Sequence, residues 1–140
     1  MIRRWMAALG LLVAVCLSAG CSTVGVENDR GFALVEPTVA NEMILDNTRI
    51  VVLDLRPADE FYGPLGHVAG AISVPLGSIE SRLGEILPYR SETVIVYADT
   101  LETGERGARL LTAAGFRNIV LIRGGIRRWI ELGYKTVRAQ

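Results

Sequence analysis

The sequence is 140 residues long and carries 15 basic and 15 acidic side chains, so its formal net charge is zero. This length leaves room for one domain at most. The absence of excess positive charge gives no electrostatic sign of a nucleic-acid partner. Its two cysteines are Cys16 and Cys21, so the sequence after Cys21 has neither a disulfide framework nor a thiolate metal site. We therefore expect no metal and no cofactor.

The first 20 residues have the composition of a secretory signal peptide. Arg3 and Arg4 stand at the start, an almost wholly apolar stretch runs from Trp5 to Leu17, and small residues follow at 18–20. The order basic, apolar, small is typical of such a signal. The apolar stretch is also shorter than the roughly 20 residues that span a bilayer. We therefore predict that residues 1–20 direct export.

The junction after this segment resembles the lipobox of bacterial lipoproteins, whose cysteine becomes the lipidated N-terminus. Here Leu17-Ser18-Ala19-Gly20 precedes Cys21, and the large apolar residue stands one place earlier than usual. Ser22 resembles the outer-membrane members, because aspartate there is the usual inner-membrane retention signal. The resemblance implies a lipid anchor on Cys21, an outer-membrane location facing the periplasm, and a tether over residues 21–30. An uncleaved signal anchor and ordinary secretion are the alternatives.

Strands and helices are predicted to alternate through a single domain at residues 31–137. We expect strands at 32–35, 50–55, 71–74, 93–97 and 119–122. We expect helices at 37–46, 58–62, 78–87, 105–114 and 125–132, with Ser78 as a cap and Pro88 as a stop. Two strands, 50–55 and 93–97, are continuous apolar runs typical of burial on both faces. The pattern predicts an α/β fold with a mainly parallel central sheet and helices on both faces.

Ligands of such sheets bind beyond the carboxyl ends of the strands. We expect residues 98–104 to form a loop between the strand at 93–97 and the helix at 105–114. A glycine-bearing loop and a helix N-terminus present unpaired N–H groups to an anion, and an arginine in the first helical turn adds a charged donor. The candidates for an anion-binding loop are Gly104, Arg106 and Gly107.

Between Phe32 and Tyr134 the sequence resembles the rhodanese-like domains. The matching blocks follow in the same order and spacing, and they are Val52–Arg56, Gly66–Ala71, Gly104–Ala108 and Gly115–Ile119, followed by Gly124–Ile126 and Trp129. In that family a cysteine after the central buried strand carries a persulfide during sulfur transfer, and loop N–H groups with an arginine stabilise the anion. The resemblance therefore implies a single rhodanese-like domain.

At the position that the resemblance assigns to the cysteine, this sequence has Ala98, and no cysteine follows it. The stretch from Ala98 to Arg106 is longer than the family's common loop, and reading residues 101–103 as an insertion restores the pattern. Asp99 is a carboxylate beside this position, but a carboxylate does not hold sulfane sulfur as a thiolate does. Asp99, Glu102 and Glu105 also bring negative charge that opposes an anion.

Other polar residues are interpreted first as structural. Asp54 and Arg56 are expected to fix loops through hydrogen bonds, and His67 is expected to be packed and hydrogen-bonded rather than a general base. Trp129 is expected in the core. Three arginines, Arg123, Arg127 and Arg128, form either a docking patch or a solvated face.

Three function classes are open to such a sequence. We favour a catalytically inactive rhodanese-like binding or regulatory module, anchored by lipid, with an envelope protein or a small anion as its partner. A rhodanese-type sulfurtransferase is the alternative, against which Ala98 stands. A phospho-receiver domain, in which Asp54 would be phosphorylated, is excluded because the first strand is followed by Glu36 alone and Lys135 comes too late.

We predict that Cys21 is lipidated. Metabolic labelling with a fatty-acid analogue should mark the wild-type protein in the outer-membrane fraction, whereas Cys21→Ser should stay unlabelled because it lacks the acceptor thiol. Cys16→Ser, which changes a cysteine inside the apolar stretch, is the matched control and should label like the wild type. Equal labelling of Cys21→Ser and wild type would contradict the prediction.

Overall fold

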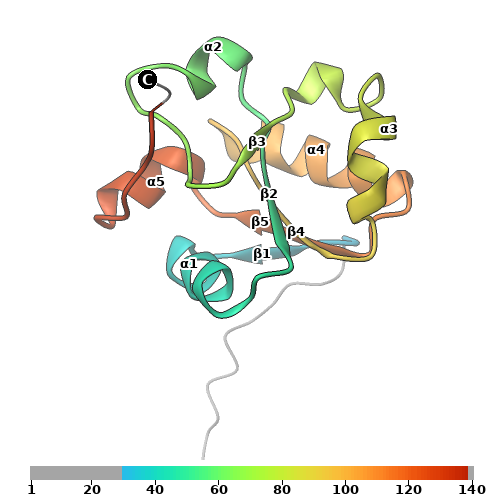
Figure 1. Cartoon of the computed structure of the whole chain (residues 1–140), viewed down its shortest axis with the longest axis horizontal. Helices are drawn as coiled ribbons and strands as arrows, with labels where there is room; N and C mark the ends of the chain where they lie inside the picture. The colour runs from blue at the N-terminus through green and yellow to red at the C-terminus, as the bar shows by residue number, and fades with distance from the viewer. Residues whose placement is uncertain (1–29, 139–140) are drawn as a thin grey trace, which may run out of the picture.

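The computed structural model describes residues 30–138, which form an α/β domain around one five-stranded sheet. All neighbouring strands are parallel, and their order is β1-β5-β4-β2-β3. The strands are β1 (Ala33–Val35), β2 (Ile50–Asp54), β3 (Ile72–Ser73), β4 (Thr93–Tyr97) and β5 (Asn118–Ile122). The predicted fold class is thereby confirmed (Figure 1).

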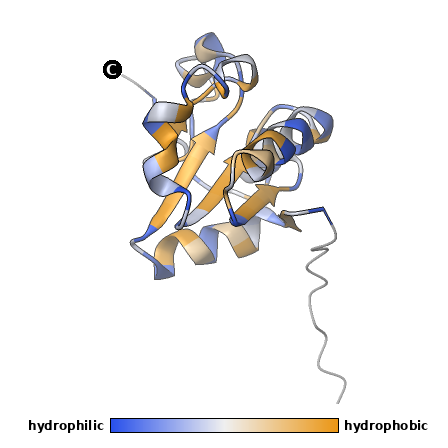
Figure 2. Cartoon of the chain, turned by 90° about the vertical axis from the view of Figure 1, so that its right-hand side faces the viewer, coloured by the Kyte–Doolittle hydropathy of each residue, from blue (hydrophilic) through white to orange (hydrophobic). Residues whose placement is uncertain are grey.

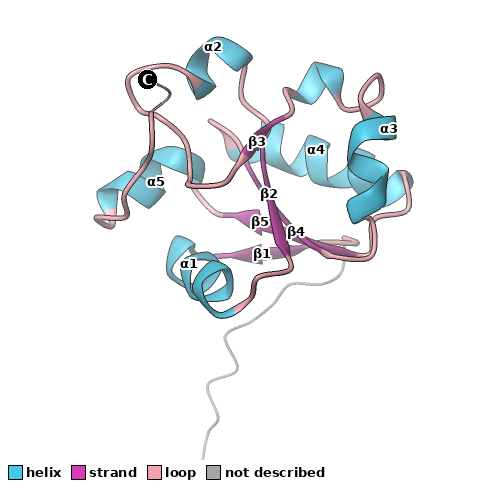
Figure 3. Cartoon of the chain, viewed as in Figure 1, coloured by secondary structure: helices cyan, strands magenta, loops and turns pink. Residues whose placement is uncertain are grey.

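Within residues 30–138, four α-helices and two short 3₁₀ turns connect the strands, and a fifth helix follows the last strand (Figure 3). The helices are α1 (Pro37–Asp46), α2 (Ala58–Phe61), α3 (Leu83–Ile86), α4 (Leu101–Ala113) and α5 (Gly125–Glu131), and the turns are η1 (Leu76–Ser78) and η2 (Leu87–Tyr89). The predicted signal peptide, 1–20, and tether residues 21–29 lie outside the described residues. Within residues 30–138, no helix has the length and apolar character needed to cross a membrane.

The central strand β4 divides the interior into two hydrophobic clusters. Val94 and Val96 belong to the cluster beneath α3 and α4, whereas Ile95 and Tyr97 belong to the cluster beneath α1 and α5. All four side chains are fully buried. This alternation follows from strand geometry, in which successive side chains point to opposite faces. Figure 2 shows strands that are mostly hydrophobic, with helices of mixed hydrophobic and hydrophilic residues around them.

Residues 30–138 hold the whole sheet together with both clusters. A unit with its own hydrophobic core is able to fold by itself. We therefore treat the chain after the predicted signal peptide as an independently folding domain.

The predicted helix at 78–87 is wrong in its extent. The segment instead forms the turn η1, a loop, the single-turn helix α3 and the turn η2. Ser78 ends η1 rather than capping a helix. Gly84, inside the predicted span, makes a long continuous helix less favourable, because a glycine costs a helix about 1 kcal/mol relative to alanine.

Candidate functional site

The carboxyl ends of β2 and β4 lie side by side, with Asp54 paired to Tyr97 in the parallel register. Beyond them is a cavity of about 450 Å³. Its lining comes from the segments after both strands, from α2 and the loop after it, and from α5. It consists of Arg56, Glu60, Pro64, Leu65, Asp99, Thr100 and Arg127. The edge that the sequence predicts for ligand binding therefore does carry a cavity.

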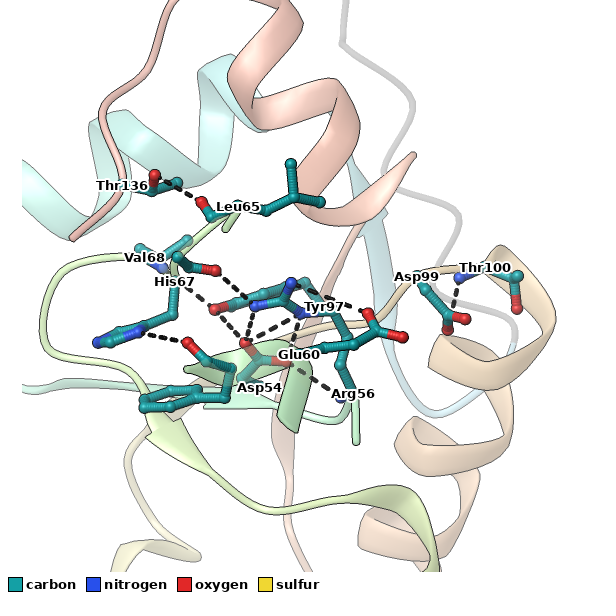
Figure 4. A network of polar contacts seen from close by, with 12 residues as sticks. Asp54, Arg56, Glu60, Leu65, His67, Val68, Tyr97, Asp99, Thr100 and Thr136 are labelled. Atoms are coloured by element: carbon teal, nitrogen blue, oxygen red, sulfur yellow. Dashed lines mark hydrogen bonds and ion pairs between the residues drawn. The ribbon is translucent and has the colours of Figure 1, made fainter. Parts of the chain in front are cut away.

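A buried polar network forms the floor of this edge (Figure 4). The Arg56 guanidinium donates two hydrogen bonds to the Asp54 carboxylate, from Nε to Oδ1 at 2.9 Å and from Nη2 to Oδ2 at 2.5 Å. The Tyr97 hydroxyl donates to Asp54 Oδ2 at 2.7 Å. Asp54, Arg56 and Tyr97 are each 0 % exposed. A buried ion pair of this kind is tolerated only when further hydrogen bonds satisfy both partners.

The same network fixes the loop that follows α2. Arg56 Nη2 donates to the Gly66 carbonyl at 2.8 Å, and the Val68 N–H donates to the Tyr97 hydroxyl at 3.1 Å. Two strand ends and the segment 66–68 are thus held in one arrangement. Asp54 and Arg56 make the loop-fixing hydrogen bonds expected of them.

Sequence reasoning gave Tyr97 no role, although it links all parts of the network. The available signal was a tyrosine at the last position of a buried strand, since a buried Tyr hydroxyl usually finds a polar partner. Burial raises the pKa of Tyr97 far above the ordinary value, and the neighbouring Asp54 charge raises it further. Tyr97 is therefore a neutral hydrogen-bond donor.

One nitrogen of Arg56 remains without a hydrogen-bond partner among the described residues. Nη1 is buried, and the closest carboxylate oxygen, Glu60 Oε2, lies 4.0 Å away. Burial by itself lowers the pKa of Arg56, but the hydrogen bonds and charge of Asp54 outweigh it, so the pKa stays raised. The cavity lining therefore contains a guanidinium whose charge is paired with Asp54 and which keeps one donor without a partner.

The predicted loop at 98–104 is wrong, because α4 begins at Leu101 rather than at Glu105. The Thr100 hydroxyl caps the helix by accepting from the Thr103 N–H at 3.1 Å. A threonine at this position stabilises a helix start by satisfying an otherwise free N–H. Residues 101–103 are thus the first turn of α4 and not a loop insertion.

Because α4 begins at Leu101, the predicted loop residues Gly104, Arg106 and Gly107 are helical residues instead. All three lie inside α4, and the Gly104 N–H is already bonded to the Thr100 carbonyl at 3.1 Å. A Cβ on Gly104 would lie 2.6 Å from Leu121 Cδ1, and one on Gly107 would collide with Leu55. Both glycines therefore allow close packing of α4 on the sheet. Arg106 is exposed.

Ala98 follows β4 directly and is only 2 % exposed. The first residue of α5, Gly125, lies against the Ala98 carbonyl, where any Cβ would overlap that oxygen. The backbone φ of Gly125 is +57°, a conformation that glycine adopts without strain. The backbone of residue 98 is therefore pinned between the sheet and the start of α5.

The remaining candidates have distinct surroundings. The His67 ring stacks on Phe61 with 3.7 Å between ring centroids, and its Nδ1 lies 3.0 Å from the Phe61 carbonyl. His67 therefore has the packed, hydrogen-bonded role expected of it.

The three grouped arginines have different partners. Arg123 pairs with Glu36 at 3.0 Å, and Arg128 pairs with Glu131 at 3.2 Å. Arg127 alone of the three grouped arginines lines the cavity. Trp129 is buried in the cluster beneath α1 and α5, as predicted.

Comparison with known proteins decides the family. The family model described as a rhodanese-like domain matches residues 36–132. The chain belongs to the rhodanese-like domain family. Its five-stranded parallel sheet is the architecture of that family's solved structures.

Among its relatives is the uncharacterised protein YibN of Escherichia coli K12, which is 29% identical over 98 residues that cover 69% of this chain and 67% of YibN. The thiosulfate sulfurtransferase of Pseudomonas aeruginosa superposes with a TM-score of 0.68 and 26% identity, covering 82% of this chain and 22% of that one. YrkF of Bacillus subtilis, a putative sulfur carrier protein, is 26% identical over 56% of this chain and 40% of its own length. This rhodanese-like domain is thus related to sulfurtransferases.

We predict that Tyr97→Phe destabilises the rhodanese-like domain by about 1–3 kcal/mol at neutral pH, because Asp54 and the Val68 N–H each lose a buried partner. Chemical denaturation measures the loss. The control Tyr62→Phe, at a side chain that is 62% exposed, should change little. A loss no larger than the control's would show that the Tyr97 hydroxyl does not hold the network.

Stability should also depend on pH through this hydroxyl. The folded domain keeps the phenol proton that the unfolded chain releases near pH 10. The contribution of Tyr97 is therefore complete below about pH 10 and falls above it by up to about 1.4 kcal/mol per pH unit. Tyr97→Phe should lack this alkaline loss. An identical loss in both proteins, measured by denaturation between neutral and alkaline pH, would contradict the assignment.

Proposed function

We propose that this protein is a catalytically inactive rhodanese-like module that binds a partner at the cavity beyond β2 and β4. We further propose that a lipid on Cys21 holds it on the periplasmic side of the outer membrane. The first proposal rests on Ala98, which is buried and stands at the position that the resemblance assigns to the family's cysteine. Sulfane sulfur needs a thiolate carrier, and the sequence after Cys21 has no thiol.

The cavity supports binding without covalent chemistry. Its volume, about 450 Å³, lies in the range of small-molecule sites. Arg127 and the unused Nη1 of Arg56 favour an anionic group, since guanidinium donors pair well with carboxylate-like or phosphate-like anions. Glu60 and Asp99 line the same cavity and select against dense negative charge. The cavity therefore suits a ligand that carries few negative charges. Such a ligand is a small anion or an acidic side chain of an envelope protein.

Sulfur transfer is the second candidate, and the relatives favour it. The names of the Pseudomonas aeruginosa and Bacillus subtilis proteins speak of a sulfurtransferase and a putative sulfur carrier. If the protein transferred sulfur, a side chain other than a thiol would have to carry it. Asp99, exposed beside Ala98, is a hard carboxylate and a poor substitute for a thiolate.

The surroundings of position 98 disfavour sulfur transfer by a thiol placed there. Residues 101–103 form the capped first turn of α4 and belong to the fold rather than to a removable loop. A thiol at position 98 would be buried next to Asp99, and both burial and a neighbouring negative charge raise the pKa of a thiol. The Thr103 N–H, at the start of α4, already donates a hydrogen bond to the Thr100 hydroxyl.

We predict that the wild-type protein transfers no sulfur from thiosulfate to cyanide, measured as thiocyanate. Ala98→Cys should show trace turnover, at least about 100-fold below the Pseudomonas aeruginosa enzyme as positive control, because a missing anion-stabilising donor typically costs on the order of 100-fold or more. Asp99→Asn is the matched control and should stay as inactive as the wild type.

Robust thiocyanate formation by the wild type would overturn the proposal of an inactive module. Intact mass after thiosulfate treatment gives an independent reading, because a sulfur carrier gains the mass of one sulfur atom. Full activity of Ala98→Cys would leave the proposal standing and refute only the argument from burial and capping.

A further inference from the structure

The amino-terminal edge of the sheet, opposite the cavity, carries a row of arginines. β2, β4 and β5 begin in register, with Ile50 beside Thr93 and Thr93 beside Asn118. Arg49 and Arg117 directly precede the first residues of β2 and β5, and Arg90 stands shortly before β4. All three side chains are exposed. We call Arg49, Arg90 and Arg117 the arginine edge.

Two surface hollows connect this edge to the place where the described chain begins. One, of about 430 Å³, is lined by Arg90, Ser91, Ala114, Gly115 and Arg117. The other, of about 230 Å³, has Arg117 and Gly31 in its lining. Arg117 thus borders both the hollow beside Arg90 and the start of the domain at Gly31. The chain enters the domain (Figure 1) at the end that carries the arginine edge.

The charges of the arginine edge are not neutralised within residues 30–138. Seven ion pairs are present in this range, and none includes Arg49, Arg90 or Arg117. The acids closest in sequence are Asp46, at the end of α1, and Glu92, just before β4. Neither carboxylate lies within 4.0 Å of an arginine nitrogen of the edge. Three unpaired cations therefore face solvent together.

We propose that the arginine edge docks the domain onto anionic phospholipid headgroups. Neighbouring strands lie about 4.8 Å apart, so cations before β2 and β5 are separated by roughly two strand spacings. Such spacing suits several headgroups in a bilayer plane rather than one bound ion. Guanidinium groups bind phosphate through paired donors. Near an anionic membrane, each arginine strengthens binding about five-fold.

This inference adds an orientation to the proposed lipid anchor. Residues 21–29 span at most about 30 Å when fully extended, so a lipid on Cys21 would keep the start of the domain close to the bilayer. With the arginine edge on the membrane, the cavity at the opposite edge of the sheet faces away from it. The ligand site is then open to partners from the periplasmic side.

Residues 22–140, without Cys21, should co-sediment with vesicles of phosphatidylcholine and phosphatidylglycerol and not with phosphatidylcholine alone. The double variant Arg90→Glu/Arg117→Glu should bind the mixed vesicles at least about 25-fold more weakly, since two such contacts are lost. The matched control is Arg106→Glu/Lys135→Glu, which changes the net charge equally at exposed positions away from the edge. It should stay within about five-fold of the parent. Thermal unfolding confirms that both variants fold.

Three results would overturn the inference. They are absence of binding to the mixed vesicles, equal losses in the two double variants, and displacement by inorganic phosphate beyond that by chloride at matched ionic strength. The last would indicate a site for a free ion. Because the tested chain has no acceptor for lipid, a failure of Cys21 labelling and a failure of this measurement are separate outcomes.

Discussion

The buried ion pair between Arg56 and Asp54 is the constraint on which the functional edge depends. Both side chains are completely excluded from solvent, Tyr97 donates a further hydrogen bond to Asp54, and the Gly66 carbonyl accepts one from Arg56. Removing one partner of such a pair leaves an uncompensated buried charge, which typically costs about 3–5 kcal/mol. The pair therefore holds the end of β2, the end of β4 and the segment 66–68 together. The cavity beyond these strand ends, which Arg56 and Asp99 line, is shaped by that arrangement.

The two ends of the parallel sheet have different characters. The carboxyl end carries a cavity with a buried cation, and the amino end carries exposed, unpaired arginines beside the start of the domain. In the account proposed above, the amino end faces the membrane and the carboxyl end faces the partner. The family determines the fold, whereas the chemistry of the site depends on the side chains that this chain places there. In the proposed function, Ala98 stands where the resemblance places a thiol, so this edge would bind an anion and not carry sulfur.

The fold was predictable because its signals are local. The apolar runs of β2 and β4 and the alternation with helices indicate a parallel sheet before any coordinates are considered. The start of α4 was missed because the glycines at 104 and 107 suggest a loop, whereas both are packing positions against Leu121 and Leu55. Thr100, a good helix cap, was the overlooked signal. The end of a buried strand indicates a polar partner for Tyr97, but the partners themselves, Asp54 and Val68, were not predictable because they lie far away in sequence.

A double-mutant cycle on Asp54 and Arg56 tests the central constraint most directly. The measured quantity is the free energy of unfolding of the wild type, Asp54→Asn, Arg56→Met and the double variant. The account predicts that each single variant is strongly destabilised and that the double variant loses less than the two losses combined, by about 1–3 kcal/mol. Losses that add to within about 0.5 kcal/mol would mean that the two side chains act independently. That result would contradict the ion pair as the element that holds the site together.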